Sequence, residues 1–272
     1  RKQLQQCTIE TINTLLEQVC GSVGLRAEDC CVAALAGNTT MVHFLLGMDA
    51  FCVFHTPFLP RIGTPGWIPA NELGLAFSGK LYVFPSAANY LGGDIISGLL
   101  YCGLFQKKEP ALFLDIGTNG EMVLGNCDFL IGGAGAAGPA LEAGISRYGM
   151  CARPGAVEHV KITDDVLHCT SIGNLPPRGI CGSGIVDLLA QMLQNGWMDE
   201  SGRLQPERSA QIREIAGQQA VVYAEAAQSA DGQALYFTQQ DIFQFTNTKA
   251  AAHTMVAMLL QQAGLPLDAV QT

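Results

Sequence analysis

One short unit near the middle of the chain constrains the fold more than any other feature. Residues 111–114 form an apolar run typical of a buried strand, residues 115–120 form a polar, Gly-rich turn, and residues 121–125 form a second strand. Two strands separated by a turn of this kind predict a β-hairpin. Because a hairpin is an antiparallel pair, the sheet that contains it cannot be wholly parallel.

The turn of this hairpin has the groups that a phosphate site needs. Asp115 ends the first strand, where a carboxylate can hold Mg²⁺ through water. Gly117 and Gly120 let backbone amides approach phosphate oxygens, and Thr118 and Asn119 add a hydroxyl and an amide. The sequence therefore predicts Asp115 as a catalytic and metal-holding residue, with the other four binding a nucleotide. The alternative is a plain hairpin turn, because Asn-Gly is a common turn pair.

The rest of the chain alternates between helical and strand patterns, which predicts an α/β fold with a mixed sheet. Short apolar runs predict strands at 31–36 and 81–84, and two more within 157–172. Residues 49–79 read as an ordered but irregular excursion, and the polar residues 206–237 predict no particular element. Apolar spacing predicts helices over 3–20, 41–46, 87–104 with an interruption at Gly92-Gly93, from Gly184 to Gly196, and from a cap at 238–241 to 262.

Two further motifs lie where a strand is expected to lead into a helix. In the first, Asn38 and Thr39 follow Gly37 and are candidate ligand-binding residues, although an N-cap explains them equally well. In the second, Gly182, Ser183 and Gly184 open a helix whose free amides attract anions. A tight turn with Ser183 as the cap is the alternative for this second motif.

A third motif, Gly92-Gly93-Asp94, offers a second catalytic carboxylate. Asp94 beside paired glycines can act as a base or as a partner of Mg²⁺, and the alternative is a helix start capped by Asp94. The small residues 136–142 include Glu142 and predict close packing, with a short helix after Pro139. The five histidines are scattered without metal-ligand spacing and are interpreted as structural.

Composition excludes several classes of function. Hydrophobic residues make up 49% of the 272 residues and charged residues 14%, which favours a buried core. The formal net charge is −9, whereas a general nucleic-acid binder needs a basic surface. No apolar run reaches the roughly 18 residues of a membrane helix, and the first residues do not resemble a signal peptide. The ten cysteines lack C-x-x-C spacing and predict reduced, mostly buried thiols in a cytoplasmic protein.

Taken together and in order, five stretches resemble the ATP-binding region of the reductive activators of corrinoid proteins. These activators belong to the acetate and sugar kinase, Hsp70 and actin superfamily. An ordered set of motifs is far more specific than any one of them alone, and the match covers most of residues 30–260. The stretches are Gly37–Met41, Gly92–Ile95, Leu114–Glu121, Ala136–Ala140 and Gly179–Gly184.

The resemblance implies an actin-like fold of mixed-sheet lobes that is incomplete at both ends. Residues 1–110 would be part of the first lobe with an irregular insert, and residues 111–272 the second lobe, truncated before the adenosine motif. It also implies an ATPase that helps drive an electron onto cob(II)alamin in a corrinoid partner protein, giving cob(I)alamin. ATP and Mg²⁺ are the expected cofactors, and a homodimer is one expected assembly.

The chain departs from the family pattern in ways that limit the expectation. No C-x₄-C-x₂-C pattern occurs, so a [2Fe-2S] centre is expected only in an N-terminal part before Arg1. The first phosphate hairpin is expected before Arg1 and the adenosine motif after Thr272, so this piece alone is expected to bind ATP poorly. Two rival interpretations stay open, namely a small-molecule kinase of the same superfamily and a non-catalytic module that docks a partner.

Overall fold

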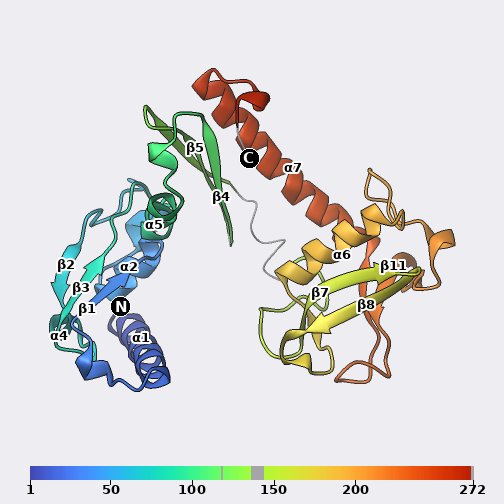
Figure 1. Cartoon of the computed structure of the whole chain (residues 1–272), viewed down its shortest axis with the longest axis horizontal. Helices are drawn as coiled ribbons and strands as arrows, with labels where there is room; N and C mark the ends of the chain where they lie inside the picture. The colour runs from blue at the N-terminus through green and yellow to red at the C-terminus, as the bar shows by residue number, and fades with distance from the viewer. Residues whose placement is uncertain (118, 136–143, 271–272) are drawn as a thin grey trace. The chain divides into compact units, whose positions relative to one another are not determined.

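The computed structural model describes residues 1–117, 119–135 and 144–270 (Figure 1). The chain forms two compact units, each with its own internal contacts. Unit 1 consists of Arg1–Leu114, Glu121–Ala134 and Leu259–Thr272, and unit 2 consists of Asp115–Gly120 and Gly135–Met258. The lobes expected over 1–110 and 111–272 stay a prediction.

The first sheet of unit 1 has the strand order β1-β3-β2. β1 (Val32–Leu35) is parallel to β3 (Lys80–Val83), and β2 (Gly66–Pro69) is antiparallel to β3, so the sheet is mixed as expected. Alternate residues of β3 point to one face, where Leu81 and Val83 join a buried cluster. The helices of this region are α1 (Lys2–Ser22), α2 (Thr39–Leu45), α3 (Phe51–Phe54) and α4 (Ala70–Leu73), of which α1, α2 and α4 contribute to that cluster.

The other face of this sheet carries a row of aromatic side chains. The ring centroid of Tyr82 lies 5.1 Å from that of Trp67 and 5.3 Å from that of Phe84. Trp67 is 57% exposed. This face of the sheet is therefore aromatic and partly exposed.

The second sheet of unit 1 contains the hairpin expected at 111–125. β4 (Ala111–Ile116), β5 (Gly120–Gly125) and β6 (Leu130–Gly135) are neighbours in that order. α5 (Gly93–Cys102) packs on this sheet, because Ile95 and Leu99 share a cluster with Ala111, Val123 and the half-buried Phe113.

The helix expected over 87–104, with an interruption at Gly92-Gly93, forms only on the C-terminal side of that interruption. Gly92 is extended (φ −83°, ψ −168°), and the helix begins only at Gly93. The amide of Gly93 donates to the carbonyl oxygen of Gly37 at 2.9 Å, outside the helix. Apolar residues occur on both sides of Gly92, but helical backbone hydrogen bonding begins only after it.

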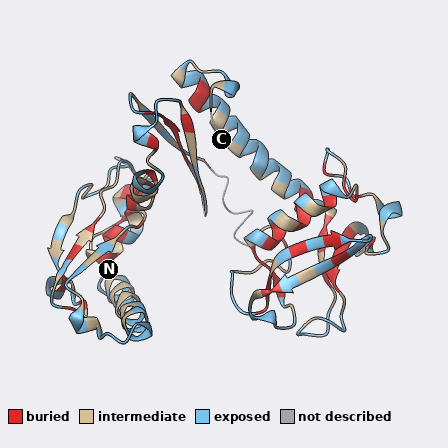
Figure 2. Cartoon of the chain, viewed as in Figure 1, coloured by how far each residue is buried: buried red, intermediate tan, exposed pale blue. Residues whose placement is uncertain are grey.

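Unit 2 has one main core beneath two small sheets. β8 (Val166–Ser171), β7 (Ala156–Thr163) and β9 (Gly179–Ile180) form one sheet in that order. β10 (Ile212–Ile215), β11 (Gln218–Ala224) and β12 (Leu235–Thr238) form the other. α6 (Gly182–Gln194) places a fully buried apolar stripe against them (Figure 2), and its members Ile185, Leu188 and Met192 share the core with Trp197 and Phe237.

The long helix α7 (Gln239–Ala263) begins at the expected cap. The amide of Thr238 donates to Asp241 Oδ2 at 2.9 Å, and the amide of Asp241 donates to Thr238 Oγ1 at 3.1 Å. Ile242 near its start and Leu259 and Leu260 near its end are buried, whereas its middle is largely exposed (Figure 2). None of the helices in the described ranges is long and apolar enough to cross a membrane.

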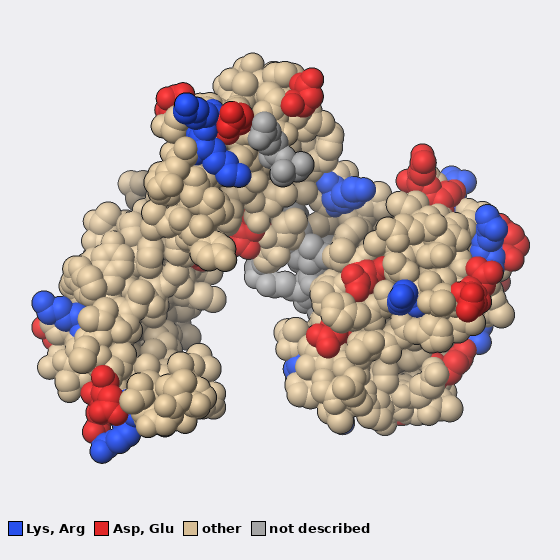
Figure 3. Space-filling model, viewed as in Figure 1, with Lys and Arg blue, Asp and Glu red and all other residues tan. Residues whose placement is uncertain are grey.

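The surface corrects one expectation about the cysteines. All ten thiols are free, but they are not mostly buried, because Cys181 alone among them is fully buried. The exposed ones lie on outward helix faces and in loops, as Cys7 does in α1 and Cys102 in α5. On the face shown in Figure 3, Lys and Arg side chains are scattered among Asp and Glu and form no continuous basic patch over the residues drawn in colour.

Candidate functional site

Two of the motifs singled out in the sequence lie against each other in unit 1. Besides the Gly93–Gly37 hydrogen bond, a Cβ atom at Gly92 would lie 2.6 Å from the Cα of Asn38 and 2.8 Å from the carbonyl oxygen of Gly37. Only glycine fits such a close backbone approach. The start of α5 is thereby locked to the loop between β1 and α2.

Asn38 and Thr39 both have structural partners in this junction. Asn38 is the N-cap of α2, and its Oδ1 accepts a hydrogen bond from the amide of Met41 at 2.9 Å. Thr39 is fully buried, and its hydroxyl donates to the carbonyl oxygen of Ala88 at 2.9 Å. The capping alternative for Asn38 is therefore correct as far as its Oδ1 is concerned, and nucleotide contacts by either residue stay a prediction.

Asp94 lies in the first turn of α5, not at its cap, which is Gly92. Its Oδ1 accepts a hydrogen bond from the amide of Ile95 at 2.9 Å, and the residue is half-buried. A carboxylate at a helix N-terminus is stabilised by the helix dipole and repels a second anion. Asp94 therefore suits a cation better than a phosphate group.

The turn after β4 is accessible around Gly117. Asp115 is the second-last residue of β4 and is half-buried, and the amide of Gly117 donates to the carbonyl oxygen of Asn119 at 2.9 Å. A Cβ atom at Gly117 would have no neighbour within 4 Å among the described residues, and the φ of Gly117 is not in the left-handed region. Contacts among the described residues do not explain the glycine at this position, and its role in binding a nucleotide stays a prediction. Gly120 begins β5 and is buried, and Thr118 lies outside the described residues.

The turn before α6 divides its glycines between two roles. A Cβ atom at Gly184 would lie 2.3 Å from the carbonyl oxygen of Val157, so this glycine is required by packing. Gly182 is half-buried and Ser183 is exposed in the first turn of the helix. The cap residue is Cys181, not Ser183, and no side chain caps it. The accessible part of this motif is therefore Gly182-Ser183. The small-residue stretch 136–143, with Glu142 and the helix expected after Pro139, lies outside the described residues.

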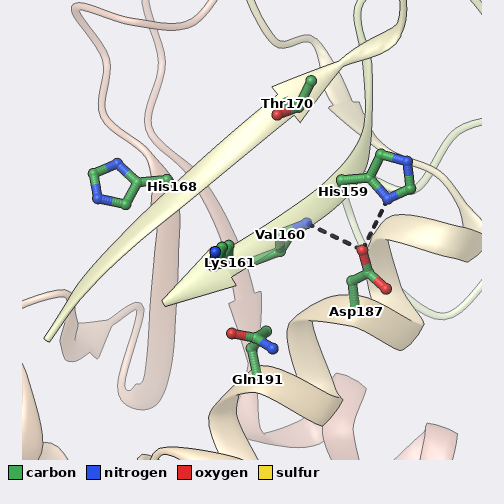
Figure 4. A pocket seen from close by; sticks show the side chains of 7 residues that line it. All are labelled: His159, Val160, Lys161, His168, Thr170, Asp187 and Gln191. Carbon is green, nitrogen blue, oxygen red and sulfur yellow. Dashed lines mark hydrogen bonds and ion pairs between the residues drawn. The ribbon is translucent and has the colours of Figure 1, made fainter. Parts of the chain in front are cut away.

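The sequence interpretation missed a depression of about 560 Å³ on the surface of unit 2, lined by seven side chains (Figure 4). Asp187 Oδ2 lies 3.0 Å from His159 Nδ1 and accepts from the amide of Val160 at 3.3 Å. Gln191 Oε1 accepts from the amide of Ile162 at 2.9 Å. In Figure 4 the ring of His168 points away from that of His159.

These bonds have a structural explanation. β7 pairs with β9 only at Ala156 and Val157, so its later amides on that edge need other acceptors. Asp187 and Gln191, one helical turn apart on α6, supply them and cover the strand edge. No linear spacing in the sequence relates these residues to His159.

Comparison with known proteins covers almost the whole chain. Residues 109–272 match the C-terminal domain of RACo, the ASKHA domain, and residues 1–107 match the RACo middle region. A solved structure named reductive activator for corrinoid, iron-sulfur protein aligns with 99% of this chain and 44% of its own, with a TM-score of 0.83 and 38% identity. These matches confirm the expected α/β fold of the ASKHA type.

Two curated proteins are similar in sequence. Corrinoid activation enzyme RamQ of Eubacterium limosum is 28% identical over 280 residues, which is 97% of this chain and 46% of RamQ. The Co(II) methylated amine-specific corrinoid protein reductase of Methanosarcina barkeri is 30% identical over 147 residues, which is 46% of this chain and 27% of that protein. The chain thus spans 46% of RamQ and 44% of the solved activator, which is about half the length of each.

Proposed function

This chain belongs to the RACo family, with the middle region and the ASKHA domain both represented, and we propose that it is the ATP-binding part of a corrinoid-activating protein. The protein would bind Mg-ATP and use it to help reduce a partner's cob(II)alamin to cob(I)alamin. The electron for cobalt would come from a reduced [2Fe-2S] domain of the full-length protein, which is not part of residues 1–272. Relatives named for corrinoid activation and for reduction of a corrinoid protein support this reading.

The observation that carries the proposal is the turn at Asp115–Gly120 inside the ASKHA domain. It joins two strands of one sheet, which fixes the carboxylate of Asp115 at a strand end. Open space beside Gly117 leaves room for a phosphate group at the backbone. A carboxylate at a strand end beside an accessible glycine suits phosphoryl chemistry, because positioning and charge stabilisation do most of the work.

The residues present suit Mg²⁺ held jointly with ATP better than a metal held by protein alone. No group of three or more His, Cys, Asp or Glu side chains in the described ranges could hold a metal ion. Mg²⁺ commonly keeps several waters and binds one or two carboxylates together with substrate phosphates. Asp115 would hold the ion through water, and the ion would neutralise charge on the phosphates.

The other motifs would take the roles that the sequence suggested for them. Asp94 would act as the second catalytic carboxylate, and Asn38 and Thr39 would contribute to the ligand site from the α2 junction. Gly182 and Ser183 would approach a phosphate through their backbone amides, and Gly184, which is buried, would support them by allowing α6 to pack closely on β7. ATP binding or hydrolysis would favour one conformational state of the complex with the corrinoid protein, because a ligand shifts an equilibrium only by its different affinity for the two states. The cytoplasm is the proposed location.

The test replaces Asp115 with Asn in the full-length protein. We expect Asp115→Asn to lower ATP-dependent reduction of a corrinoid partner by about 10²-fold or more, because the charge facing the metal ion is lost. Corrinoid absorbance and phosphate release report the two activities. The control is Asp128→Asn, which changes an exposed carboxylate in the other turn of the same sheet. Equal activity of both variants would remove Asp115 from the mechanism.

A second variant separates ligand contact from folding. Gly117→Ala meets open space and an unstrained φ, so the thermal unfolding temperature should stay unchanged. If a phosphate approaches this backbone, the added methyl group should weaken Mg-ATP binding about tenfold, a change that calorimetric titration resolves. Phosphorylation of a small acceptor without any corrinoid protein would favour the kinase alternative, and no binding of Mg-ATP by the full-length protein would favour the docking module.

A further inference from the structure

His43 is fully buried in α2, and both of its ring nitrogens bond to backbone atoms. Nδ1 lies 2.6 Å from the carbonyl oxygen of Thr39, and Nε2 accepts a hydrogen bond from the amide of Arg61 at 3.0 Å. A backbone amide can only donate, so Nε2 is the acceptor and Nδ1 carries the proton. The ring is therefore a neutral imidazole in one tautomer, joining two segments of unit 1.

One of these segments is the Gly37–Thr39 junction described above. It is held by Gly93 at the carbonyl oxygen of Gly37 and by Ala88 at the hydroxyl of Thr39. His43 adds a third bond, at the carbonyl oxygen of Thr39. Because Thr39 directly follows the N-cap Asn38, this bond fixes the first turn from which the Asn38 side chain projects.

The other segment is the irregular chain between α2 and β2. It presents exposed apolar side chains, among them Phe51, Phe58 and Leu59. The Asn89 side-chain amide donates to the carbonyl oxygens of Val53 and Phe58. Since Asn89 directly follows Ala88, the partner of Thr39, the segment and the junction are connected at two places, by His43 and by residues 88–89.

We propose that His43 is a positioning residue for the nucleotide. It sets the place of Asn38 and Thr39 by bonding one turn of α2 to the backbone at Arg61, and it does not touch the ligand itself. The inference rests on the proposed function, since it takes Asn38 as a nucleotide contact. Filling this volume alone would need only an apolar side chain, which carries no desolvation cost. A buried ring satisfied at both nitrogens instead defines the relative position of two segments.

His55 supplies a matched control within the same region. Its Nδ1 lies 3.2 Å from the carbonyl oxygen of Phe51, also four residues earlier, but the side chain is exposed. Binding of Mg-ATP to the full-length protein is measured by calorimetry at 15 °C. We expect His43→Phe to raise the Kd about tenfold and His55→Phe to change it less than about twofold. An unchanged Kd in folded His43→Phe overturns the positioning role.

A double-mutant cycle shows whether His43 acts through Asn38. Asn38→Ser keeps an oxygen that can cap α2 but loses the carboxamide. If His43 positions Asn38, adding His43→Phe to Asn38→Ser should change the Kd less than about twofold. Independent, multiplicative effects would mean that His43 only stabilises the fold, and would overturn the proposal.

Two further outcomes are distinguishable. If circular dichroism shows that His43→Phe is unfolded, His43→Asn takes its place, because the Asn amide can still donate to Thr39 but the shorter side chain has no atom at the place of Nε2, which accepts from Arg61. If the wild-type protein itself does not bind Mg-ATP, the proposed function fails and the positioning role fails with it. Wild-type binding with a normal Asn38→Ser variant overturns only the positioning role.

Discussion

At the scale of single residues, burial separates the cysteines by reactivity. The Cys169 thiol donates to the carbonyl oxygen of Tyr223 at 3.1 Å, and burial raises the pKa of this thiol to about 12. Cys102 is exposed at the end of α5. Because the thiolate is the reactive species, Cys169 should react much more slowly than Cys102 although both are free cysteines.

We therefore expect alkylation of the native protein at pH 8 to label Cys102 much faster than Cys169, because burial shields the Cys169 thiol and suppresses its thiolate. Peptide mass spectrometry after timed labelling measures both rates in one sample. In denaturant the difference should disappear, which controls for the peptide chemistry. Comparable rates in the native protein would mean that Cys169 is accessible.

At this scale, part of the candidate site could be predicted from the sequence. Asn38 before a helix predicted an N-cap, because its side chain bonds an amide three residues on. The nearness of Gly92 to Asn38, and of His43 to Arg61, could not be predicted, because these contacts depend on how β1, α2 and α5 pack. A single sequence shows local chemistry and leaves such long-range pairs undetermined.

At the scale of elements, the β10–β11 connection contains a strained residue. Ile215 pairs with Gln218, so the loop is Ala216-Gly217, with φ of +53° and +82°. Positive φ at both positions is the type I′ geometry, which favours Asn-Gly. Alanine pays a steric cost in the left-handed region that asparagine tolerates better.

We expect Ala216→Asn to stabilise unit 2 by about 0.5–1 kcal/mol, and thermal unfolding measures the change. The matched variant Ala216→Val should destabilise it, because a β-branched side chain fits this conformation worst. A lower unfolding temperature for Ala216→Asn than for the wild type would argue against the I′ turn.

The elements that the sequence predicted are those with strong local signals. α7 has a capping pair at its start and Gly264 after its end, and α6 has a clear apolar stripe. β10 gave no pattern because the charged residues Arg213 and Glu214 are adjacent, and β11 gave none because it is buried on both faces from Ala220 to Ala224. β2 is only four residues long and ends in Pro69. Short or two-sided strands form because neighbouring strands supply hydrogen bonds, which a local pattern does not contain.

At the scale of the whole molecule, the two units have separate cores. Ile185 belongs to the core of unit 2 and Leu45 to a core of unit 1, and both are fully buried. α7 contributes residues to both units. Cores that share no side chains can unfold in separate transitions.

We expect calorimetry of the chain to resolve two transitions. Ile185→Ala should lower the free energy of unfolding of unit 2 by about 2–5 kcal/mol, the usual cost of a cavity in a core, and shift the transition of unit 2 to a lower temperature. Leu45→Ala should lower the free energy of unfolding of unit 1 by a similar amount, and it serves as the reciprocal control. A single transition that both variants shift equally would show that α7 couples the units into one cooperative system.

The placement of the chain's two tryptophans gives each unit a natural optical reporter. Trp67 belongs to the aromatic row of unit 1 and is exposed, whereas Trp197 is fully buried in the core of unit 2. Indole emits at shorter wavelengths in apolar surroundings than in water, so the blue part of the spectrum comes from one unit and the red part from the other. Intrinsic fluorescence can therefore follow nucleotide effects on each half of the chain without any label.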